Sequence, residues 1–443
     1  MTERLIALLD GRKIGTVDYN NSRLSLTYGK AWREAPDAYP LSLSLPLGSA
    51  THGHARVDAF LWGLLPDNDR VLQSWAKRFK VSPRNAFRLI ANVGEDCAGA
   101  VQFIRPERIA SLDRDTVSEN VTWLTLKKVA ERLRTLRSDP SEGRIAGDHG
   151  QFSLAGAQPK TALLLQKGRW GVPAGRIPTT HILKPPTGEW EGHAENEHFS
   201  LQLARSLGLV VPNSTVQRFE EEIAIVVERF DRVRNGRGWS RIHQEDFCQA
   251  LGRHPALKYE SDGGPGVAEI AGALRDNSSS AEEDLWAFLD AIAFNWLIAG
   301  TDAHAKNFAL LHGPGTVRLA PFYDLASILP YDRKIDLRKA KMAMKLGGEC
   351  RLQYIGLRHW QRLAKSVRVS ETDLIGRVVS MVNQLPGRIE EVRLACIREG
   401  LSAPVIDSLS KALIPRAKIC GRLLGMWVKN RPYQGDKSES AYS

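Results

Sequence analysis

Cysteine is scarce in this sequence, and long hydrophobic runs are absent from it. The five cysteines are odd in number and no two of them form a Cys-x-x-Cys pair; they are Cys97, Cys248, Cys350, Cys396 and Cys420. This spacing excludes a disulfide framework and a structural zinc site built on paired cysteines. No apolar run approaches the roughly 18–20 residues of a membrane-spanning helix, and the first residues lack the pattern of a signal peptide. We therefore expect a cytoplasmic protein with no membrane partner.

Acidic residues are fewer than basic ones. The 443 residues include 61 Lys and Arg against 50 Asp and Glu, which gives a formal charge of +11 and a pI near 9.4. Such a charge suits an acidic partner, whether nucleic acid, ATP or an acidic protein. Basic residues cluster at 333–345 and 411–431. Both clusters are typical of solvated helix faces, and the first also suits a surface that faces a polyanion.

Residues 300–324 carry the most informative pattern. Asp302 is followed by Asn307 five positions later, and by Asp324 after a stretch that predicts a hairpin. Kinase-type sites use a carboxylate to orient the attacking hydroxyl, and an Asn and an Asp to hold magnesium against the ATP phosphates. These three residues have the required types in the required order. The alternative is that Asp302 caps a turn and Asp324 lies on the surface.

The predicted hairpin explains why this spacing works. Residues 308–312 and 317–321 have the composition of strands, and Gly313-Pro-Gly-Thr316 between them is turn chemistry. An antiparallel return brings Asn307 and Asp324 to the same end of the hairpin. Two oxygen ligands can there share a hard cation such as magnesium, with water and phosphate completing its shell.

The order of the predicted elements indicates an α+β protein with two lobes. Strands dominate the N-terminal part, and an amphipathic helix with a capping-box sequence at Ser280–Glu283 leads to the loop at Asp302. From about residue 243 onward we expect a largely helical chain apart from the hairpin. A β-rich lobe followed by a helical lobe with an acidic loop is the order of protein-kinase-like enzymes. The predicted domains are a β-rich part at 1–110, an ATP-binding region at 111–240, a helical lobe at 241–435 and a disordered tail at 436–443.

The remaining ATP apparatus is expected in the β-rich lobe. Lys184 ends an apolar strand, from which a buried ammonium can reach phosphates, and Glu195 or Glu197 on the next helix can orient it. The alternative for Lys184 is a lysine that extends from the strand end into solvent. Glu228 and Phe230 lie where the chain crosses between lobes. We expect the backbone there to bind an adenine edge and Phe230 to pack on the ring.

A loop of small residues precedes the strand at 161–165. Its sequence is Ser153-Leu-Ala-Gly-Ala-Gln-Pro-Lys160, which lets the main chain approach an anion closely. It differs from a Walker A motif because Pro159 stands where that motif has glycine. The residues expected at the phosphates are Ala155, Gly156, Ala157 and Gln158.

Five motifs in this order resemble the HipA family of bacterial serine/threonine kinase toxins. They are Ser153–Lys160, His181–Lys184, Val227–Arg232, Thr301–Asn307 and Tyr323–Asp324. The segments Phe60–Asp67 and Gly94–Ala100 are similar to the N-terminal subdomain of that family. Each motif alone is a weak signal, but five in order are specific, and the resemblance covers residues from about 1 to 430.

The resemblance implies an ATP-dependent kinase that uses Mg²⁺ and acts as the toxin of a type II toxin–antitoxin pair, arresting growth and promoting persistence. Members of the family bind a small helix-turn-helix antitoxin, HipB, and repress their own operon on DNA as a complex. The best-known member phosphorylates an aminoacyl-tRNA synthetase. No helix-turn-helix is evident in this sequence, so DNA recognition is expected mainly through the antitoxin.

The resemblance also implies roles for single residues. Asp302 is the catalytic base, and Asn307 and Asp324 hold magnesium. Lys184 contacts ATP, and Glu228 with Phe230 lies at the adenine. His304 and Lys306 join the nucleotide-binding residues.

Ser153 is implied to be a site of inhibitory autophosphorylation. A dianionic phosphoserine there would disfavour the packed loop and displace it from the nucleotide site. The sequence departs from the family at Pro159, where the best-known member has Glu. This proline restricts Gln158 and removes one N–H, which affects the phosphate contacts of the loop.

Two other functions fit the same sequence. One is a transcriptional corepressor bound to an antitoxin, in which kinase activity is secondary. The other is a small-molecule kinase, since lobed ATP-binding folds serve many acceptors. Asp302→Asn is expected to abolish phosphate transfer under either kinase hypothesis, yet leave antitoxin binding and repression intact.

Overall fold

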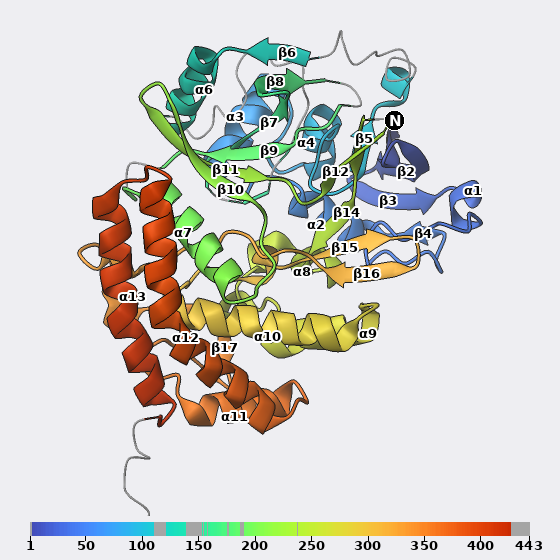
Figure 1. The fold of residues 1–443 in the computed structure, drawn as a ribbon. Helices are drawn as coiled ribbons and strands as arrows, with labels where there is room; N and C mark the ends of the chain where they lie inside the picture. The colour runs from blue at the N-terminus through green and yellow to red at the C-terminus, as the bar shows by residue number, and fades with distance from the viewer. Residues whose placement is uncertain are drawn as a thin grey trace, which may run out of the picture.

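Two large antiparallel sheets and a helical lobe make up the part of the chain that the structure describes. The computed structural model describes residues 2–109, 121–138, 153, 155–156, 158–174, 177–186, 190–236 and 238–426. The sheets fill the upper half of Figure 1 and the long helices of the helical lobe the lower half. The predicted α+β arrangement of a β-rich part followed by a helical lobe is confirmed.

The N-terminal sheet has five strands in the order β4-β3-β2-β1-β5. Their bounds are β1 Glu3–Leu9, β2 Arg12–Asn20, β3 Arg23–Tyr28, β4 Thr51–His52 and β5 Val101–Ile104. Asp10 and Gly11 join β1 to β2 with φ values of 45° and 78°, the left-handed conformations that a tight hairpin turn requires. Alternate residues of β1, Leu5, Ala7 and Leu9, face a core shared with the helices of this part.

Within the described residues, the α-helices that accompany this sheet lie between β3 and β5. They are α1 (Lys30–Arg33), α2 (His54–Gly63), α3 (Asp69–Phe79) and α4 (Ala86–Val93). The side chains of Asn68 and Asn85 accept backbone N–H groups at the starts of α3 and α4, which fixes where these two helices begin. Residues 64–67 follow α2 and carry the chain to the cleft described below.

The second sheet has six strands in the order β10-β11-β9-β7-β8-β6. Their bounds are β6 Val121–Leu124, β7 Thr161–Gln166, β8 Arg169–Pro173, β9 His181–Lys184, β10 Ser214–Phe219 and β11 Glu222–Glu228. Helix α6 (Leu126–Ser138) packs on one face, where Val129 and Leu133 meet Ala224 and Val226 of β11. The intervening Ile225 and Val227 turn to the other face, toward α7 (His193–Ser206).

The helical lobe is built around one buried helix, α10 (Ala281–Ile298), whose second half is buried on all sides. The other helices are α8 (Phe247–Ala250), α9 (Val267–Asn277), α11 (Leu357–Ser366), α12 (Glu371–Arg398) and α13 (Ala403–Leu423). Trp296 of α10 and Trp360 of α11 pack edge to face, with ring centroids 5.4 Å apart. This rigid support holds the loop that follows α10.

The predicted hairpin is present as β15 (Ala309–Gly313) and β16 (Thr316–Leu319). The lobe is largely helical as predicted, but two details of the prediction were wrong. The chain after residue 243 contains more strands than the hairpin, because β14 (His243–Asp246) pairs with β15, and β17 (Lys341–Leu346) pairs with β18 (Glu349–Arg351). The hairpin of β12 (Arg232–Asn235) and β13 (Gly238–Arg241) leads into β14.

The second error concerns the start of α10. Ser280 is its N-cap residue, but its side chain makes no capping hydrogen bond. Ser278 instead donates its hydroxyl to Asp284 at 2.5 Å, and the Ser278 hydroxyl accepts the Ser280 N–H at 3.1 Å. Asp284 also accepts from the Arg318 guanidinium and the Leu319 N–H, so this carboxylate ties α10 to β16.

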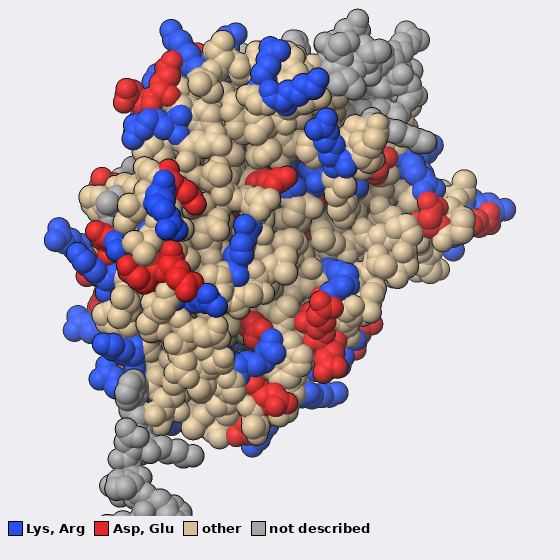
Figure 2. Space-filling model, in the orientation of Figure 1, with Lys and Arg blue, Asp and Glu red and all other residues tan. Residues whose placement is uncertain are grey.

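The basic clusters differ from the expected solvated helix faces in two respects. Residues 333–345 contain the 3₁₀ turn η7 (Leu337–Lys339) and most of β17 rather than an α-helix. Arg416 of α13 is buried, and its guanidinium donates to the Trp296 carbonyl at 2.8 Å. Arg338 and Lys339 are exposed and pair with Asp336. Figure 2 shows Lys and Arg scattered among Asp and Glu over the visible face. Lys429 and Arg431 lie outside the described residues.

All five cysteines are free. No helix within the described ranges has both the length and the apolar character needed to cross a membrane. The predicted domain limits at 110, 240 and 435 stay predictions. The first and last of them, and the tail at 436–443, lie outside the described residues.

Candidate active site

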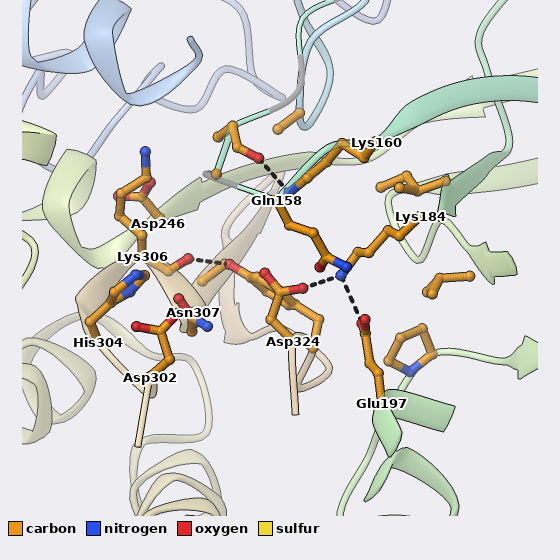
Figure 3. Close-up of a pocket in the computed structure, with 18 of the residues that line it drawn as sticks. Gln158, Lys160, Lys184, Glu197, Asp246, Asp302, His304, Lys306, Asn307 and Asp324 are labelled. Atoms are coloured by element: carbon orange, nitrogen blue, oxygen red, sulfur yellow. Dashed lines mark hydrogen bonds and ion pairs between the residues drawn. The ribbon is translucent and has the colours of Figure 1, made fainter. Parts of the chain in front are cut away.

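One cavity of about 480 Å³ lies where the two sheets meet the helical lobe. Eleven residues singled out from the sequence line it: Ala155, Gly156, Gln158, Lys184, Glu228, Phe230, Asp302, His304, Lys306, Asn307 and Asp324. Figure 3 shows the charged members pointing into this cavity from separate segments of the chain. Ala157 lies outside the described residues, and Ser153 is buried beside the cavity rather than lining it.

Asp302 lies on the loop that follows α10. The helix ends at Ala299, which has a left-handed φ of 55°, and the Gly300 N–H donates to the Asn295 carbonyl at 2.8 Å. A Cβ at Gly300 would lie 2.5 Å from the side-chain oxygen of the buried Asn295, so a larger residue here would displace that side chain. The Asp302 side chain is exposed, and its Oδ1 accepts the Tyr259 hydroxyl at 2.6 Å. It is therefore open to a second molecule and oriented by a tyrosine.

Asn307 and Asp324 flank the β15–β16 hairpin. Asn307 closes a 3₁₀ turn, η5 (Ala305–Asn307), just before β15, and Asp324 comes five residues after β16 ends. Both line the cavity, and Figure 3 shows their side chains on the same side of it as Asp302. Asp324 has a φ of 56°, in the left-handed region that residues other than glycine rarely adopt. Such a backbone is typical of functional sites, because the surrounding fold must hold it in place.

Lys184, at the end of β9, lies between two carboxylates. Its Nζ donates to Glu197 Oε1 of α7 at 2.7 Å and also to Asp324 Oδ1. The Lys184 and Glu197 side chains are 6% and 2% exposed. Burial opposes the charge on Lys184, but the two carboxylates outweigh it and hold the pKa of Lys184 above its usual range. The same contact, with Lys160 nearby, holds the pKa of Asp324 well below its usual range despite burial.

The structure therefore distinguishes the two glutamates of α7. Glu197 contacts Lys184, whereas no contact of Glu195 with Lys184 is present. Glu197 Oε2 is buried and has no hydrogen-bond partner among the described residues. A buried carboxylate oxygen without a partner leaves room for a water or a ligand group to donate to it.

The loop before β7 closes one side of the cavity. Lys160 donates its ammonium to the Ala155 carbonyl at 2.8 Å, and burial lowers the pKa of this lysine. Gly156 has a φ of 103°, and a Cβ there would lie 2.6 Å from Lys160 Nζ. The loop is thus folded tightly on its own lysine, which the predicted list of phosphate-contacting residues missed. Pro159 is buried and lines the cavity.

Ser153 fixes the start of this loop to the N-terminal part. Its side chain is fully buried, its hydroxyl donates to the Leu64 carbonyl at 2.7 Å, and its N–H donates to the Asp96 carbonyl at 2.9 Å. A phosphate on this hydroxyl has no space in the packed loop and cannot donate to Leu64.

The segment that crosses between the lobes forms another wall of the cavity. Phe230 stacks on Tyr323, with ring centroids 5.8 Å apart and an interplanar angle of 29°. The Tyr323 hydroxyl donates to the Lys306 carbonyl at 2.7 Å. Glu228 is exposed and accepts the Asn213 side-chain amide at 2.9 Å. Phe230 is thus connected to the loop of Asp302 through a single tyrosine.

A buried ionic cluster holds this crossing segment in place. Arg229 donates to Asp231 at 2.8 Å, and Arg232 donates to Asp96 of the N-terminal part at 2.8 Å. Burial raises the pKa of Asp96, but Arg232, Arg229 and Arg241 outweigh it and hold this pKa well below its usual range. The N-terminal part is therefore tied to the cavity wall by charged contacts.

Besides Lys160, the sequence analysis missed Asp67 and Lys258, which line the cavity, and Tyr259, which contacts Asp302. Asp67 falls at the end of a motif that was noted only as a family resemblance. No spacing relates Lys258 and Tyr259 to the loop of Asp302, because they lie more than forty residues earlier in the chain.

The donor set suits a magnesium–nucleotide complex better than a protein-only metal site. Asn307 and Asp324 offer oxygen ligands, which magnesium prefers. No group of three His, Cys, Asp or Glu side chains that could hold a metal occurs within the described ranges. Phosphate and water oxygens would therefore have to complete the shell. Four lysines, Lys160, Lys184, Lys258 and Lys306, supply positive charge around the cavity.

Comparison with known proteins finds similar sequences over almost the whole chain. The profile of the HipA N-terminal domain matches residues 5–104, and that of the HipA-like C-terminal domain matches residues 152–389. A protein of Sinorhizobium fredii named "Putative kinase Y4mE" is 35% identical over 423 residues, which is 95% of this chain and 99% of that protein. The serine/threonine-protein kinase toxin HipA of Shewanella oneidensis is 28% identical over 397 residues, 85% of this chain and 86% of that one.

A solved structure agrees with these sequence matches. The complex of HipA, HipB and operator DNA from Shewanella oneidensis MR-1 contains a chain that superposes with a TM-score of 0.79 at 25% identity, covering 95% of this chain and 98% of that one. The two-lobed, protein-kinase-like fold expected from the sequence is thus confirmed. The matched profiles span more than half of the sequence, and a relative above 30% identity is covered almost completely. The chain belongs to the HipA family.

Proposed function

We propose that this protein is an ATP-dependent serine/threonine protein kinase that acts as the toxin of a toxin–antitoxin pair. The observation that carries the proposal is the grouping of exposed Asp302 with Asn307, Asp324 and the Lys184–Glu197 pair around one cavity. A kinase needs these residue types within reach of one bound nucleotide. Membership of the HipA family and the named activity of the Shewanella relative support the same function.

In the proposed reaction, Asp302 accepts the proton of a serine or threonine hydroxyl on the substrate. The hydroxyl oxygen forms a bond to the γ-phosphorus of ATP while the bond from that phosphorus to the bridging oxygen breaks. The electron pair of the broken bond stays on ADP, and the products are a phosphoester and ADP. The Tyr259 hydroxyl orients the Asp302 carboxylate for this step.

The other cavity residues bind and orient the nucleotide. Lys184, held by Glu197 and Asp324, contacts its phosphates. Magnesium held by Asn307 and Asp324 would supply positive charge to the phosphate oxygens. The backbone of residues 155–158 faces the phosphates, with His304 and Lys306 beside them. Glu228 and Phe230 lie at the adenine end.

Burial keeps His304 neutral in this arrangement. Its pKa is lowered from the ordinary value by burial, against the opposing influence of Asp302. A neutral imidazole next to the catalytic carboxylate does not compete with the substrate hydroxyl for that carboxylate by ion pairing. This supports Asp302 as the residue that accepts the proton.

Ser153 is proposed as the site of autophosphorylation that switches the kinase off. Its hydroxyl is fully buried against Leu64, so a phosphate dianion there can persist only if residues 153–160 leave their packed position. The loop would then no longer line the nucleotide site. Regulation by this route requires no contact with Asp302 in the packed state.

The proposed partners are a HipB-like helix-turn-helix antitoxin and, through it, operator DNA. The Shewanella HipA was solved together with HipB and its operator DNA, and the high coverage of that match supports a similar assembly. A corepressor function is compatible with this assembly and independent of phosphate transfer. The proposed class of substrate is a component of translation such as an aminoacyl-tRNA synthetase.

The test is intact mass with peptide mapping after incubation of dephosphorylated protein with Mg-ATP, beside the Asp302→Asn variant. Phosphate on Ser153 in the wild type alone is the expected result. Transfer that persists in Asp302→Asn, or its absence from a wild type that binds ATP and is offered candidate protein substrates, would overturn the kinase proposal. Retained antitoxin binding by both proteins would then favour the corepressor function.

A further inference from the structure

Asp67 connects the N-terminal part of the chain to the two loops of the proposed phosphotransfer site. It follows α2 and is contributed by the region that matches the HipA N-terminal domain. Its Oδ1 accepts the Lys306 ammonium at 2.6 Å, and its Oδ2 accepts the Lys258 ammonium at 2.8 Å. Each carboxylate oxygen therefore has its own lysine. Lys306 directly precedes Asn307, so the contact reaches the loop of Asp302.

The backbone of the same residue holds the other loop. The Asp67 N–H donates to the Gly156 carbonyl at 3.2 Å, and Pro66 forms a parallel bridge with Gly156. Gly156 is part of the loop proposed to face the phosphates. A single residue thus contacts the phosphate-facing loop through its main chain and the catalytic loop through its side chain.

The three charged groups are almost fully withdrawn from water at the wall of the cavity. Their side chains are 13% exposed for Asp67, 15% for Lys258 and 4% for Lys306. Burial raises the pKa of Asp67, but the two lysines outweigh it and lower this pKa below its ordinary value, so the carboxylate is ionised at neutral pH. The triad carries one net positive charge and faces the space that also receives Lys184 and Lys160.

Stability alone is a poor reason for such an arrangement. The free-energy cost of removing three ions from water largely cancels their mutual attraction. Apolar side chains of similar size usually stabilise a fold as well. Three segments far apart in sequence, around residues 67, 258 and 306, converge here, and they converge at a cavity rather than in the core. The arrangement provides the cavity with a lysine whose ammonium is held at a defined position.

We propose that Asp67 is a positioning residue of the kinase: its carboxylate holds Lys306 where the transferred phosphoryl group needs a positive charge, and its backbone fixes the phosphate-facing loop relative to that lysine. This inference rests on the proposed kinase function. The N-terminal part then completes the active site within the same chain. Asp67 acts through Lys306 and does not itself touch the substrate.

The effect of removing the charge is specific. Asp67→Asn keeps the size and the backbone contact with Gly156, but removes the carboxylate with which Lys306 and Lys258 form ion pairs. The cavity gains one positive charge, so the affinity for ATP is expected to rise severalfold. The ammonium of Lys306 is no longer held, so kcat falls by about ten- to a hundredfold, the order expected when a reacting partner is misplaced by about 1 Å. Asp67→Glu keeps the charge and is expected to recover part of kcat.

The decisive experiment is a double-mutant cycle of Asp67→Asn with Lys306→Met, with ATP affinity by calorimetry and kcat for phosphate transfer measured on the full chain. If Asp67 acts through Lys306, its substitution lowers kcat in the wild type and hardly at all in Lys306→Met. The exposed Asp69→Asn, two residues away, is the matched control and should leave both quantities unchanged. Equal losses in the two backgrounds would overturn the proposal. So would a loss of ATP affinity together with a lower melting temperature and an unchanged kcat.

The nucleotide measurements separate this inference from the kinase proposal. If the wild type transfers no phosphate, the kinase function fails, yet Asp67→Asn is still expected to tighten ATP binding severalfold and Lys306→Met to reverse this in the double variant. The contrary result in an inactive protein is that Asp67→Asn leaves both the ATP affinity and its salt dependence at the wild-type values. That result would show that Asp67 has no electrostatic effect on nucleotide binding, and it would overturn the positioning role separately.

Discussion

Lys184 Nζ lies 2.7 Å from Glu197 Oε1, and both side chains are almost fully buried. The same ammonium contacts Asp324, so the strand β9, the helix α7 and the segment after β16 meet at one charge. A buried ammonium shared by two carboxylates is held at a defined position by the fold. The cavity is therefore organised around the residue proposed to receive the ATP phosphates.

Glu197→Gln tests this organisation. The variant keeps the shape of the side chain but removes the charge that holds Lys184, leaving Asp324 as its charged partner. We expect kcat/KM for ATP to fall by about ten- to a hundredfold, since a buried hydrogen bond to a charged group contributes about 1.5–3 kcal/mol. Glu195→Gln, on the same helix and also buried, makes no contact with Lys184 and is the control. Equal effects of the two substitutions would contradict the assignment.

Tyr259→Phe removes the hydroxyl that donates to Asp302 and keeps the aromatic ring. We expect kcat to fall by about tenfold, because the carboxylate loses one orienting donor worth about 1–1.5 kcal/mol. ATP affinity, measured by calorimetry, should stay unchanged since Asp302 is proposed to contact the acceptor. Tyr354→Phe on the surface is the control. A large loss of ATP affinity with an unchanged kcat would show that Tyr259 serves the nucleotide instead.

Ser153→Ala and Ser153→Asp separate packing from charge. The alanine variant loses the hydrogen bond to Leu64, so its free energy of unfolding should fall by about 1 kcal/mol while ATP binding is retained. The aspartate variant places a carboxylate against the Leu64 carbonyl, where it cannot donate. Its dissociation constant for ATP should rise by about tenfold or more. Aspartate and alanine variants that bind ATP equally well would argue against loop displacement by phosphorylation.

Asp246 predicts a pH dependence of stability. Burial raises the pKa of this carboxyl to about 6, against the opposing influence of Lys306. The folded pKa is above the unfolded one, so between pH ~4 and ~6 the folded state binds more protons, and stability falls as the pH rises through this window. The loss amounts to about 3 kcal/mol at most, for a shift of roughly two pKa units.

Denaturant unfolding measured across this window tests the assignment. Asp246→Asn preserves an acceptor for the Gln249 N–H at the start of α8, because asparagine is a good N-cap residue. This variant should lose the slope between pH 4 and 6 and be more stable than the wild type at pH 7. The exposed Asp276→Asn should leave the slope in place. A slope that survives in Asp246→Asn would assign it to another group.

Prediction from local sequence patterns worked best where the contacts join residues that are close together in the chain. The Gly-Pro-Gly-Thr turn specifies the β15–β16 hairpin, so the neighbourhood of Asn307 and Asp324 could be predicted from residues 307–324 alone. The capping box at Ser280 failed because other partners take its groups: the Ser278 hydroxyl accepts the Ser280 N–H, and Glu283 pairs with Arg318 at 2.9 Å. A local motif is decisive only where no distant partner offers a better hydrogen bond.

The sequence by itself determined the family, the residue types of the proposed active site and the hairpin that brings two of them together, because these are properties of short segments and of their order. Only the tertiary structure decided that Glu197 rather than Glu195 contacts Lys184, that Tyr259 orients Asp302, and that Asp67 joins the phosphate-facing loop to Lys306. The physical reason is that these contacts join segments up to 239 residues apart. Their geometry follows from how the sheets and the helical lobe pack together, and no spacing along the chain records it.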